Sequence, residues 1–393
     1  MPEDSIMADV IIIGAGAAGL ICAIEAGKRN RSILVLDHSG TAGTKIRVSG
    51  GGRCNFTNIN MDHTHYLSNN PHFCKSALAR FSPHDFIEML DKHGIEYYEK
   101  EAGQMFCKKS SKEILVMLKS ECKEYGVKMI LNCRIESAKK KKQFAITTDK
   151  GIFESESLVI ATGGLSYPNL GATDIGHRLA RQFGLNVTPL RPALTPIKFS
   201  KPDRKAFGEL SGISITAIVS CNDVHFRGDI LFTHRGLSGP AILQSSSYWN
   251  KGDTISINLL PGMDAYEFLI SKRKSRTEMK NLLSGHLPSR FAEKWCEMNM
   301  KSKPLCQYNE KELRQAAYKL NNWEIAPEGV DGYKAAEVTR GGVDTDELSS
   351  QTMEAKKAHG LYFAGEVVDV IGQLGGYNLH WAWASGFVAG QYV

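Results

Sequence analysis

The stretch that decides the fold is residues 8–37, ADVIIIGAGAAGLICAIEAGKRNRSILVLD. Residues 8–13 form a short β-branched run that ends at a glycine, which is typical of a buried parallel strand. A glycine turn follows, then an apolar segment at 20–28 that predicts a helix, and then a second buried strand at 32–36. This order predicts one βαβ unit of a dinucleotide-binding domain.

The glycines of this turn each have a physical task in binding a diphosphate. Gly14 permits the tight turn, Gly16 lets backbone N–H groups approach the phosphates, and Gly19 lets the helix pack on the strand. Asp37 ends the second strand, where a carboxylate accepts a hydrogen bond from a ribose 2′-hydroxyl. Because an acid at this position repels a 2′-phosphate, the pattern disfavours NADP at this site.

Further turns downstream favour FAD over NAD, because an NAD dehydrogenase needs no such motifs there. Residues 159–164 (VIATGG) and 361–366 (LYFAGE) each predict a buried strand that ends in a turn of small residues. Glu366 is placed to accept hydrogen bonds from ribityl hydroxyls. A helix that opens near residues 375–376 presents N–H groups to the flavin edge that gains negative charge on reduction. The site residues predicted from these turns are Thr162, Gly163, Glu366, Gly375 and Gly376.

A glycine-rich polar stretch at 40–58 is too long for an ordinary turn, which favours a functional loop. Lys45 and Arg53 lie in this loop, and cations beside a flavin stabilise its reduced anionic form. Solvent-facing charges are the alternative. Cys54 has no neighbouring cysteine partner, so we expect a backbone or packing role rather than a redox thiol.

Composition excludes several protein classes. The 393 residues suggest two or three domains, or one large domain with an insertion, and 42% apolar with 23% charged residues excludes a disordered, fibrous or polytopic membrane chain. The net charge of +6 is too weak to argue for nucleic acid on its own. Nine cysteines without a Cys-x-x-Cys pair argue against a disulfide framework, an Fe–S cluster or another metal site. We expect no membrane span, no signal peptide and a cytoplasmic protein.

The chain is expected to have an interrupted domain. Prolines near residue 190 mark a change in the sequence pattern, and the pattern typical of a buried strand returns at residues 361–364. We therefore predict an α/β, Rossmann-like FAD-binding domain formed by residues 1–190 and 336–393. An inserted cap region at 191–335 is expected to be β-rich over 191–262 and helical over 263–322.

Five segments together resemble one known family. They are residues 44–58 (TKIRVSGGGRCNFTN), 161–173 (ATGGLSYPNLGAT), 231–244 (LFTHRGLSGPAILQ), 336–343 (AEVTRGGV) and 360–386 (GLYFAGEVVDVIGQLGGYNLHWAWASG). The sequence is similar to bacterial FAD-binding proteins labelled aminoacetone-oxidase-like, or predicted NAD(FAD)-utilising dehydrogenases, a group that includes a bile-acid enone reductase. The resemblance implies a two-dinucleotide-binding-type FAD fold with an inserted β-rich and helical region.

The resemblance also implies a set of flavin contacts. The family has glutamine at the position of His380 and an acidic residue at that of Ile175. The implied contacts, to which we add Asn55 and Tyr377 from the same motifs, are Gly14, Gly16, Ala17, Ala18, Gly19, Asp37, Lys45, Gly51, Gly52, Arg53, Cys54, Ile135, Gly365, Glu366 and Asn378.

Other candidate residues keep two interpretations each. His234 is our candidate proton donor, with a structural histidine as the alternative. Tyr377 and Trp381 either wall the flavin pocket or pack in the core. The basic residues between Lys272 and Lys280 form a solvated helix face or meet an acidic ligand such as an NADPH phosphate.

The sequence therefore predicts an FAD-dependent oxidoreductase that transfers hydride between flavin N5 and a small organic substrate, by amine oxidation or enone reduction. No second Gly-x-Gly-x-x-Gly motif is present in strand and helix context, so NAD(P)H visits the flavin directly, or the substrate and oxygen complete the cycle. We expect no nucleic-acid partner and no membrane partner. The alternative is a flavin-holding redox sensor or RNA-associated flavoprotein with incidental turnover.

Overall fold

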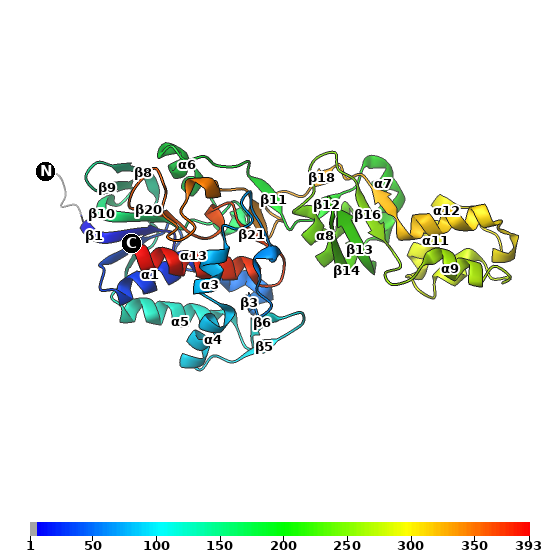
Figure 1. Cartoon of the computed structure of the whole chain (residues 1–393), viewed down its shortest axis with the longest axis horizontal. Coiled ribbons are helices and arrows are strands. Elements are labelled where there is room, and N and C mark those ends of the chain that lie inside the picture. The colour runs from blue at the N-terminus through cyan, green and yellow to red at the C-terminus, as the bar shows by residue number, and fades with distance from the viewer. Residues whose placement is uncertain (1–5) are drawn as a thin grey trace. The chain divides into compact units, whose positions relative to one another are not determined.

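A computed structural model describes residues 6–393, which divide into two compact units (Figure 1). The discontinuous unit comprises Met1–Arg191 and Val338–Val393, and the inserted unit comprises Pro192–Glu337. The chain passes from the first to the second through β11 (Arg191–Ala193) and returns through β19 (Val338–Arg340). Each unit has a hydrophobic core of its own.

The discontinuous unit is built on a seven-stranded sheet in the order β7-β2-β1-β10-β9-β8, with β20 also paired to β10. Strands β7, β2, β1, β10 and β20 are parallel to their neighbours, and β9 and β8 are antiparallel. Residues 10–13 are buried because both faces of the parallel strands are covered. This is the predicted Rossmann-like α/β fold, which is confirmed. The strands are β1 (Ile6–Ile13), β2 (Ile33–Leu36), β7 (Lys128–Ile130), β8 (Ile135–Lys140), β9 (Phe144–Thr148), β10 (Gly151–Ile160) and β20 (Leu361–Phe363).

The first and last helices of this unit, α1 (Ala17–Lys28) and α13 (Tyr377–Tyr392), pack against each other, and α5 (Ser111–Glu124) packs on α1 (Figure 1). Two small sheets complete the unit, β3-β6-β5 and β21-β4. The remaining elements are α2 (Thr44–Val48), β3 (Asn55–Asn58), β4 (Tyr66–Leu67), α3 (Lys75–Arg80), α4 (Pro83–Lys92), β5 (Tyr97–Glu99), β6 (Gln104–Cys107), α6 (Ile175–Gln182) and β21 (Ile371–Gly372).

The inserted unit combines a second seven-stranded sheet with six α-helices. The sheet order is β17-β16-β13-β14-β15-β12-β18, and buried and exposed side chains alternate along β13 as expected for a sheet with one face on a core. Its strands are β12 (Ile197–Lys198), β13 (Ser214–Cys221), β14 (Val224–Phe232), β15 (Gly236–Ser238), β16 (Ile255–Asn258), β17 (Trp323–Ile325) and β18 (Gly329–Val330). Its helices are α7 (Lys201–Phe207), α8 (Pro240–Ser246), α9 (Ala265–Ser271), α10 (Met279–Leu283), α11 (Ser289–Asn299) and α12 (Glu310–Asn321).

Two local expectations were wrong. Residues 151–160 form one ten-residue strand, β10, which begins well before the short buried strand expected at the start of residues 159–164. Glu154 and Glu156 alternate with the buried Phe153 and Ser155, so the strand continues through them. The long loop at 40–58 contains the short helix α2 and the strand β3.

The described residues carry no disulfide, and eight of the nine cysteines are buried. Between residues 6 and 393 no helix combines the length and apolarity needed to cross a bilayer.

Candidate flavin site

The first glycine turn has the geometry that a diphosphate requires. A Cβ on Gly14 would lie 2.3 Å from the Ala161 carbonyl oxygen, and one on Gly19 would lie 1.9 Å from the Gly14 carbonyl oxygen, so both positions exclude a side chain. A Cβ on Gly16 would meet nothing within 4 Å. Gly16 is the N-cap of α1 and provides no side-chain cap, so the helix presents unsatisfied N–H groups to this open space.

Asp37 is fixed by the backbone on both sides. Its carboxylate accepts hydrogen bonds from the Ala15 N–H at 2.6 Å and from the Ser39 N–H at 2.7 Å. Each carboxylate oxygen keeps a second lone pair, which leaves capacity for a ribose hydroxyl. The Cys133 N–H donates to the Asp37 carbonyl oxygen at 2.9 Å, and this places the nearby Ile135, at the start of β8, beside the same end of the sheet.

The end of β10 adds an unsatisfied polar group. The Thr162 hydroxyl is buried without a hydrogen-bond partner among the described residues. Gly163 adopts φ +72°, and a Cβ there would meet nothing within 4 Å. Since Gly14 abuts Ala161 and Thr162, this turn and the first glycine turn lie side by side.

The loop after α2 is shaped by a run of residues in the left-handed region. Gly50, Gly51 and Gly52 adopt φ of +55°, +65° and +86°, and Cys54 adopts +51°. A Cβ on Gly51 or Gly52 would face open space, so the backbone of this loop is accessible to a ligand. Burial raises the pKa of the Cys54 thiol to about 12, which favours the packing role over a reactive thiolate. Arg53 is exposed and donates to the Tyr98 hydroxyl at 3.2 Å.

An ion pair joins this loop region to the C-terminal part of the chain. The Lys45 ammonium lies 2.5 Å from a Glu366 carboxylate oxygen, across 321 positions of sequence. The other Glu366 oxygen accepts from the Thr339 N–H at 2.9 Å, and the Thr339 hydroxyl accepts from the Leu165 N–H at 2.7 Å. Glu366 is therefore held in one orientation by two separate segments.

The turn before α13 meets the β3 strand. A Cβ on Gly376 would lie 2.4 Å from the Thr57 carbonyl oxygen, which leaves room for glycine alone. Asn55 lies 3.2 Å from the Gln104 side chain and, in the orientation that satisfies its amide, 3.2 Å from the Gly376 N–H. Gly375 and Gly376 both have positive φ, and Gly376 caps α13 without a side-chain hydrogen bond.

Two residues that were predicted to contact the flavin have side chains that already contact other parts of the protein. The Asn378 side chain accepts from the Gly372 N–H at 2.8 Å and donates to the Gly372 carbonyl oxygen at 2.7 Å, so it braces the preceding turn. The Tyr377 ring is buried and stacks on His65 with centroids 4.6 Å apart. The Trp381 indole donates to the Gly365 carbonyl oxygen at 3.1 Å and is fully packed, which favours its core interpretation.

Helices α1 and α13 run parallel and direct both N-termini the same way. Gly386 abuts Ala18, with 2.3 Å from its would-be Cβ to the Ala18 carbonyl oxygen, and Gly390 abuts Cys22 in the same manner at 2.8 Å. Ala18 is the second residue of α1, whereas Gly386 lies in the middle of α13. The N-terminus of α13 therefore projects beyond that of α1 by about 12 Å, at 1.5 Å per residue.

These features fit an extended dinucleotide. Two uncapped helix N-termini, an acid for a ribose, backbone left open at Gly16, Gly51, Gly52 and Gly163, and an orphaned hydroxyl at Thr162 occur in one unit and are tied together by the contacts above. His234 is not among them, because it lies in the inserted unit on the exposed turn between β14 and β15.

Three supporting residues were missed by sequence reasoning. Thr339 positions Glu366, Gln104 contacts Asn55, and His65 stacks on Tyr377. Thr339 lies within the quoted segment 336–343, which was a usable signal. Gln104 and His65 lie in segments without a recognisable motif.

His380 makes the stability of this region depend on pH. Burial lowers the pKa of His380 to about 4 from its ordinary 6.5. Its Nε2 lies 2.9 Å from the Phe81 carbonyl oxygen, an acceptor only, so Nε2 donates and Nδ1 accepts from the Thr57 hydroxyl at 2.8 Å. The neutral ring is thus the form that the fold holds. The contribution of the neutral His380 ring to the free energy of unfolding is complete above pH 6.5 and is lost as the pH falls through about 4.

We expect His380→Gln to reduce the acid sensitivity of the protein. Glutamine can make both hydrogen bonds without a titrating group, so the free energy of unfolding should fall by about 2 kcal/mol less between pH 7 and pH 5 than in the wild type. Chemical denaturation at the two pH values measures this. Equal losses in both proteins would contradict it.

The chain matches the family described as HI0933-like protein Rossmann domain over residues 8–392. It belongs to this HI0933-like family. The match covers both segments of the discontinuous unit and the whole inserted unit, so the insertion is part of the family pattern.

Curated relatives of this HI0933-like chain carry two kinds of name. A protein of Escherichia coli named ribosomal RNA dihydrouridine synthase is 48% identical over 98% of this chain and 97% of its own length. One of Haemophilus influenzae with the same name is 43% identical over 96% of each chain. A 3-dehydro-bile acid delta(4,6)-reductase of Clostridium scindens is 29% identical over 97% of each chain, which agrees with the bile-acid reductase resemblance.

The family and the fold establish the general class. The HI0933-like chain is an FAD-dependent flavoprotein oxidoreductase. The predicted cofactor and enzyme class are thereby confirmed at this level.

Proposed function

We propose that this protein is an FAD-dependent reductase of uridine in ribosomal RNA. The observation that carries the proposal is the pair of relatives at 48% and 43% identity, both named ribosomal RNA dihydrouridine synthase and both matched over almost their whole length. The composition led us to expect no nucleic-acid partner, and the names of these relatives are the reason to propose one.

The more distant relative supports the same chemistry on another substrate. A 3-oxo bile acid with delta(4,6) unsaturation and uracil both contain a carbon–carbon double bond conjugated to a carbonyl group, and in both names the product has gained two hydrogens. The electrophilic carbon of such a system is β to the carbonyl, which is C6 in uracil, and the proton goes to C5. The enone reduction predicted from the sequence thus extends to a nucleobase. None of these three names describes the oxidation of an amine.

The residues proposed to hold FAD are those that converge in the discontinuous unit. The α1 N-terminus and Gly16 would contact the diphosphate, and Asp37 a ribose. Glu366, fixed by Lys45 and Thr339, would accept from the ribityl hydroxyls, and the α13 N-terminus would stabilise negative charge at the ring. Bound and reduced FAD supplies the hydride. Also within this proposed set are Gly14, Ala17, Ala18, Gly19, Gly51, Gly52, Arg53, Cys54, Asn55, Ile135, Thr162, Gly163, Gly365, Gly375, Gly376, Tyr377 and Asn378.

His234 remains our candidate for the acid that protonates C5. It is exposed, and the turn that carries it is held by the Thr233 hydroxyl, which donates to the Gly236 carbonyl oxygen at 3.0 Å and accepts from the Gly236 N–H at 3.1 Å. A fixed turn keeps an exposed imidazole in a limited region, as proton delivery to one carbon requires. For the reductant we propose NADH or NADPH, bound transiently at the flavin.

The decisive experiment uses a strain that lacks the gene. We expect dihydrouridine to disappear from its ribosomal RNA and to return when the wild-type gene is supplied, as measured by mass spectrometry of nucleosides. Purified protein with FAD and NAD(P)H should add two hydrogen atoms to a uridine of ribosomal RNA from the deletion strain. An unchanged dihydrouridine content, with rapid turnover of a 3-oxo-delta(4,6) steroid, would overturn the proposal. If the deletion leaves the dihydrouridine content unchanged and the purified protein turns over neither substrate, the sensor alternative is favoured.

A further inference from the structure

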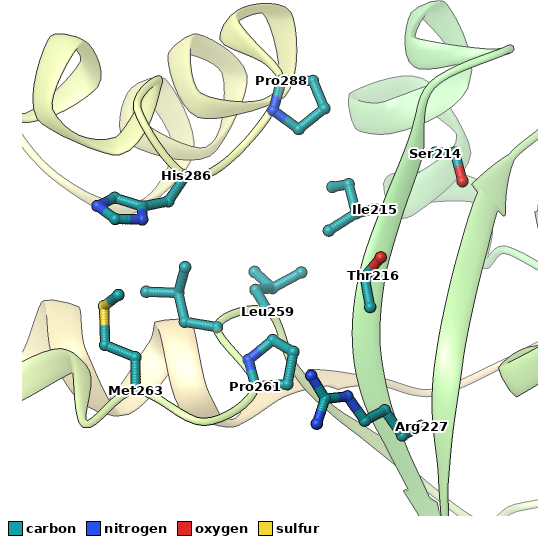
Figure 2. Close-up of a pocket in the computed structure, with 10 residues that line it drawn as sticks. Ser214, Ile215, Thr216, Arg227, Leu259, Pro261, Met263, His286 and Pro288 are labelled. Carbon is teal, nitrogen blue, oxygen red and sulfur yellow. The ribbon is translucent and has the colours of Figure 1, made fainter.

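The inserted unit contains a pocket of about 340 Å³ that the proposed flavin chemistry does not use. It lies between the β13–β14 part of the sheet and the segment that joins α10 to α11 (Figure 2). Its apolar wall includes Leu259, Pro261, Met263 and Pro288. A volume near the lower end of the usual range for small-ligand sites is of the size that a single nucleotide fills.

Two side chains give this pocket a basic and partly aromatic character. Arg227 projects from β14 toward Pro261, and His286 lies on the opposite wall with its ring on the side of Met263 (Figure 2). Among the described residues the Arg227 guanidinium has no ion pair or hydrogen bond, and its side chain is exposed. His286 is also exposed, and its ring is held edge to face by Phe268 with centroids 4.8 Å apart.

Two acidic side chains near the pocket have hydrogen-bond partners other than Arg227. The Asp229 carboxylate, on β14 near Arg227, accepts from the Thr216 hydroxyl at 2.6 Å. Asp264 caps α9 by accepting from the Tyr266 N–H at 2.8 Å and the Glu267 N–H at 3.2 Å. Neither carboxylate forms an ion pair with Arg227 within residues 6–393, so the guanidinium N–H groups remain available to an anion.

A basic segment continues from the pocket along α9. Met263, which lines the pocket, precedes α9, and Lys272 follows its last residue about 10 Å farther along the helix axis. Lys272, Lys274 and Arg276 are exposed and take no part in an ion pair within residues 6–393. These cations lie in the turn after α9 rather than on a helix face, which corrects the solvated-helix interpretation. A row of free cations beyond the pocket suits a polyanion better than one small molecule.

We propose that this pocket and the adjoining basic segment bind a single-stranded part of the RNA that carries the uridine to be reduced. This inference rests on the proposed function and deepens it. One base would contact the apolar wall and the His286 ring, its phosphate would pair with Arg227, and the phosphates that follow would meet Lys272, Lys274 and Arg276. Stacking and phosphate pairing of this kind bind single strands without a sequence code.

The binding test uses the full-length, FAD-loaded protein and a fluorescein-labelled twelve-nucleotide oligouridine as probe. Affinity is measured by anisotropy at several KCl concentrations. Lys272→Ala/Lys274→Ala/Arg276→Ala should flatten the slope of log K against log salt by about 2, at about 0.7 per lost phosphate contact. The matched control Lys139→Ala/Lys141→Ala/Lys142→Ala removes the same charge from the discontinuous unit and should leave the slope unchanged.

Arg227→Ala tests the pocket itself. We expect it to weaken oligouridine binding about tenfold, while the visible flavin spectrum and the rate of flavin reduction by NADPH stay as in the wild type. If Arg227→Ala slows reduction by NADPH and leaves RNA affinity intact, the pocket is a nicotinamide nucleotide site and the inference is overturned. Unchanged RNA binding and salt slope in both variants would also overturn it.

Failure of the inference and failure of the proposed function give different results. If both variants restore ribosomal dihydrouridine in the deletion strain as fully as the wild type and bind RNA normally, the inference fails and the proposed function stands. If the wild-type gene itself restores none, the proposed function fails as well.

Discussion

Gly16→Val is expected to give a folded protein that has lost its yellow colour. The backbone of Gly16 is extended, with φ −86° and ψ −167°, so valine adopts it without strain. A Cβ at this position meets nothing within 4 Å, so the apoprotein should change in stability by less than about 1 kcal/mol. The added methyl groups would occupy the space over the α1 N-terminus. We expect FAD affinity to fall at least 1000-fold, or about 4 kcal/mol.

Gly19→Ala provides the contrast. Its Cβ would lie 1.9 Å from the Gly14 carbonyl oxygen, so alanine forces α1 away from β1 and destabilises the apoprotein by about 1–3 kcal/mol. Visible absorbance after purification and thermal unfolding of the apoproteins distinguish the two effects. A yellow Gly16→Val protein with wild-type affinity would show that the diphosphate does not bind at this turn.

The second large effect is expected where α1 and α13 pack against each other. Gly386→Leu would place a branched side chain where a Cβ alone comes within 2.3 Å of the Ala18 carbonyl oxygen. The helices must separate, and because ten of the sixteen residues of α13 are buried, the core of the discontinuous unit loses its packing. We expect loss of FAD and of the cooperative unfolding transition of this unit. Gly386→Ala should cost about 1–3 kcal/mol.

The inserted unit shows whether Gly386→Leu unfolds the discontinuous unit alone. Its core is separate, so limited proteolysis of Gly386→Leu should leave a resistant fragment within residues 192–337. A Gly386→Leu protein that keeps FAD and the wild-type melting temperature would contradict the close helix packing described here. Complete digestion of both units would mean that the inserted unit depends on the other for its stability.

The local part of the fold was predictable because neighbouring residues determine it. The βαβ unit from β1 to β2 needs only a buried strand, a glycine turn and an apolar helix, and all three are consecutive in the sequence. Strand β10 was misjudged because Glu154 and Glu156 interrupt its apolar pattern. In the sheet these side chains face outward while their neighbours are buried. Helix α2, with five residues, is too short to show a helical period.

The candidate site was predictable only in part, because its parts are distant in the chain. Nothing in the local pattern around Lys45 indicates a pairing with Glu366, and nothing around Asn55 indicates contact with Gly376. Lys45, Glu366 and Gly376 were proposed one by one from the loop and the turns that contain them, and Asn55 from the motifs of the family resemblance. The structure brings them together in two pairs. Asn378 was also proposed through the family resemblance, but the motif does not reveal the hydrogen bonds by which its side chain braces a turn.

The split arrangement of the discontinuous unit has a consequence for synthesis on the ribosome. β20 pairs with β10 and α13 packs on α1, yet both elements belong to the last 56 residues. At about 5–20 residues per second, the nascent N-terminal part waits roughly 10–40 s for them while the insertion is made. During that interval residues 158–160 of β10 lack their partner strand β20 and one side of α1 stays uncovered, so newly made chains should depend on chaperones at this stage more than the mature protein does.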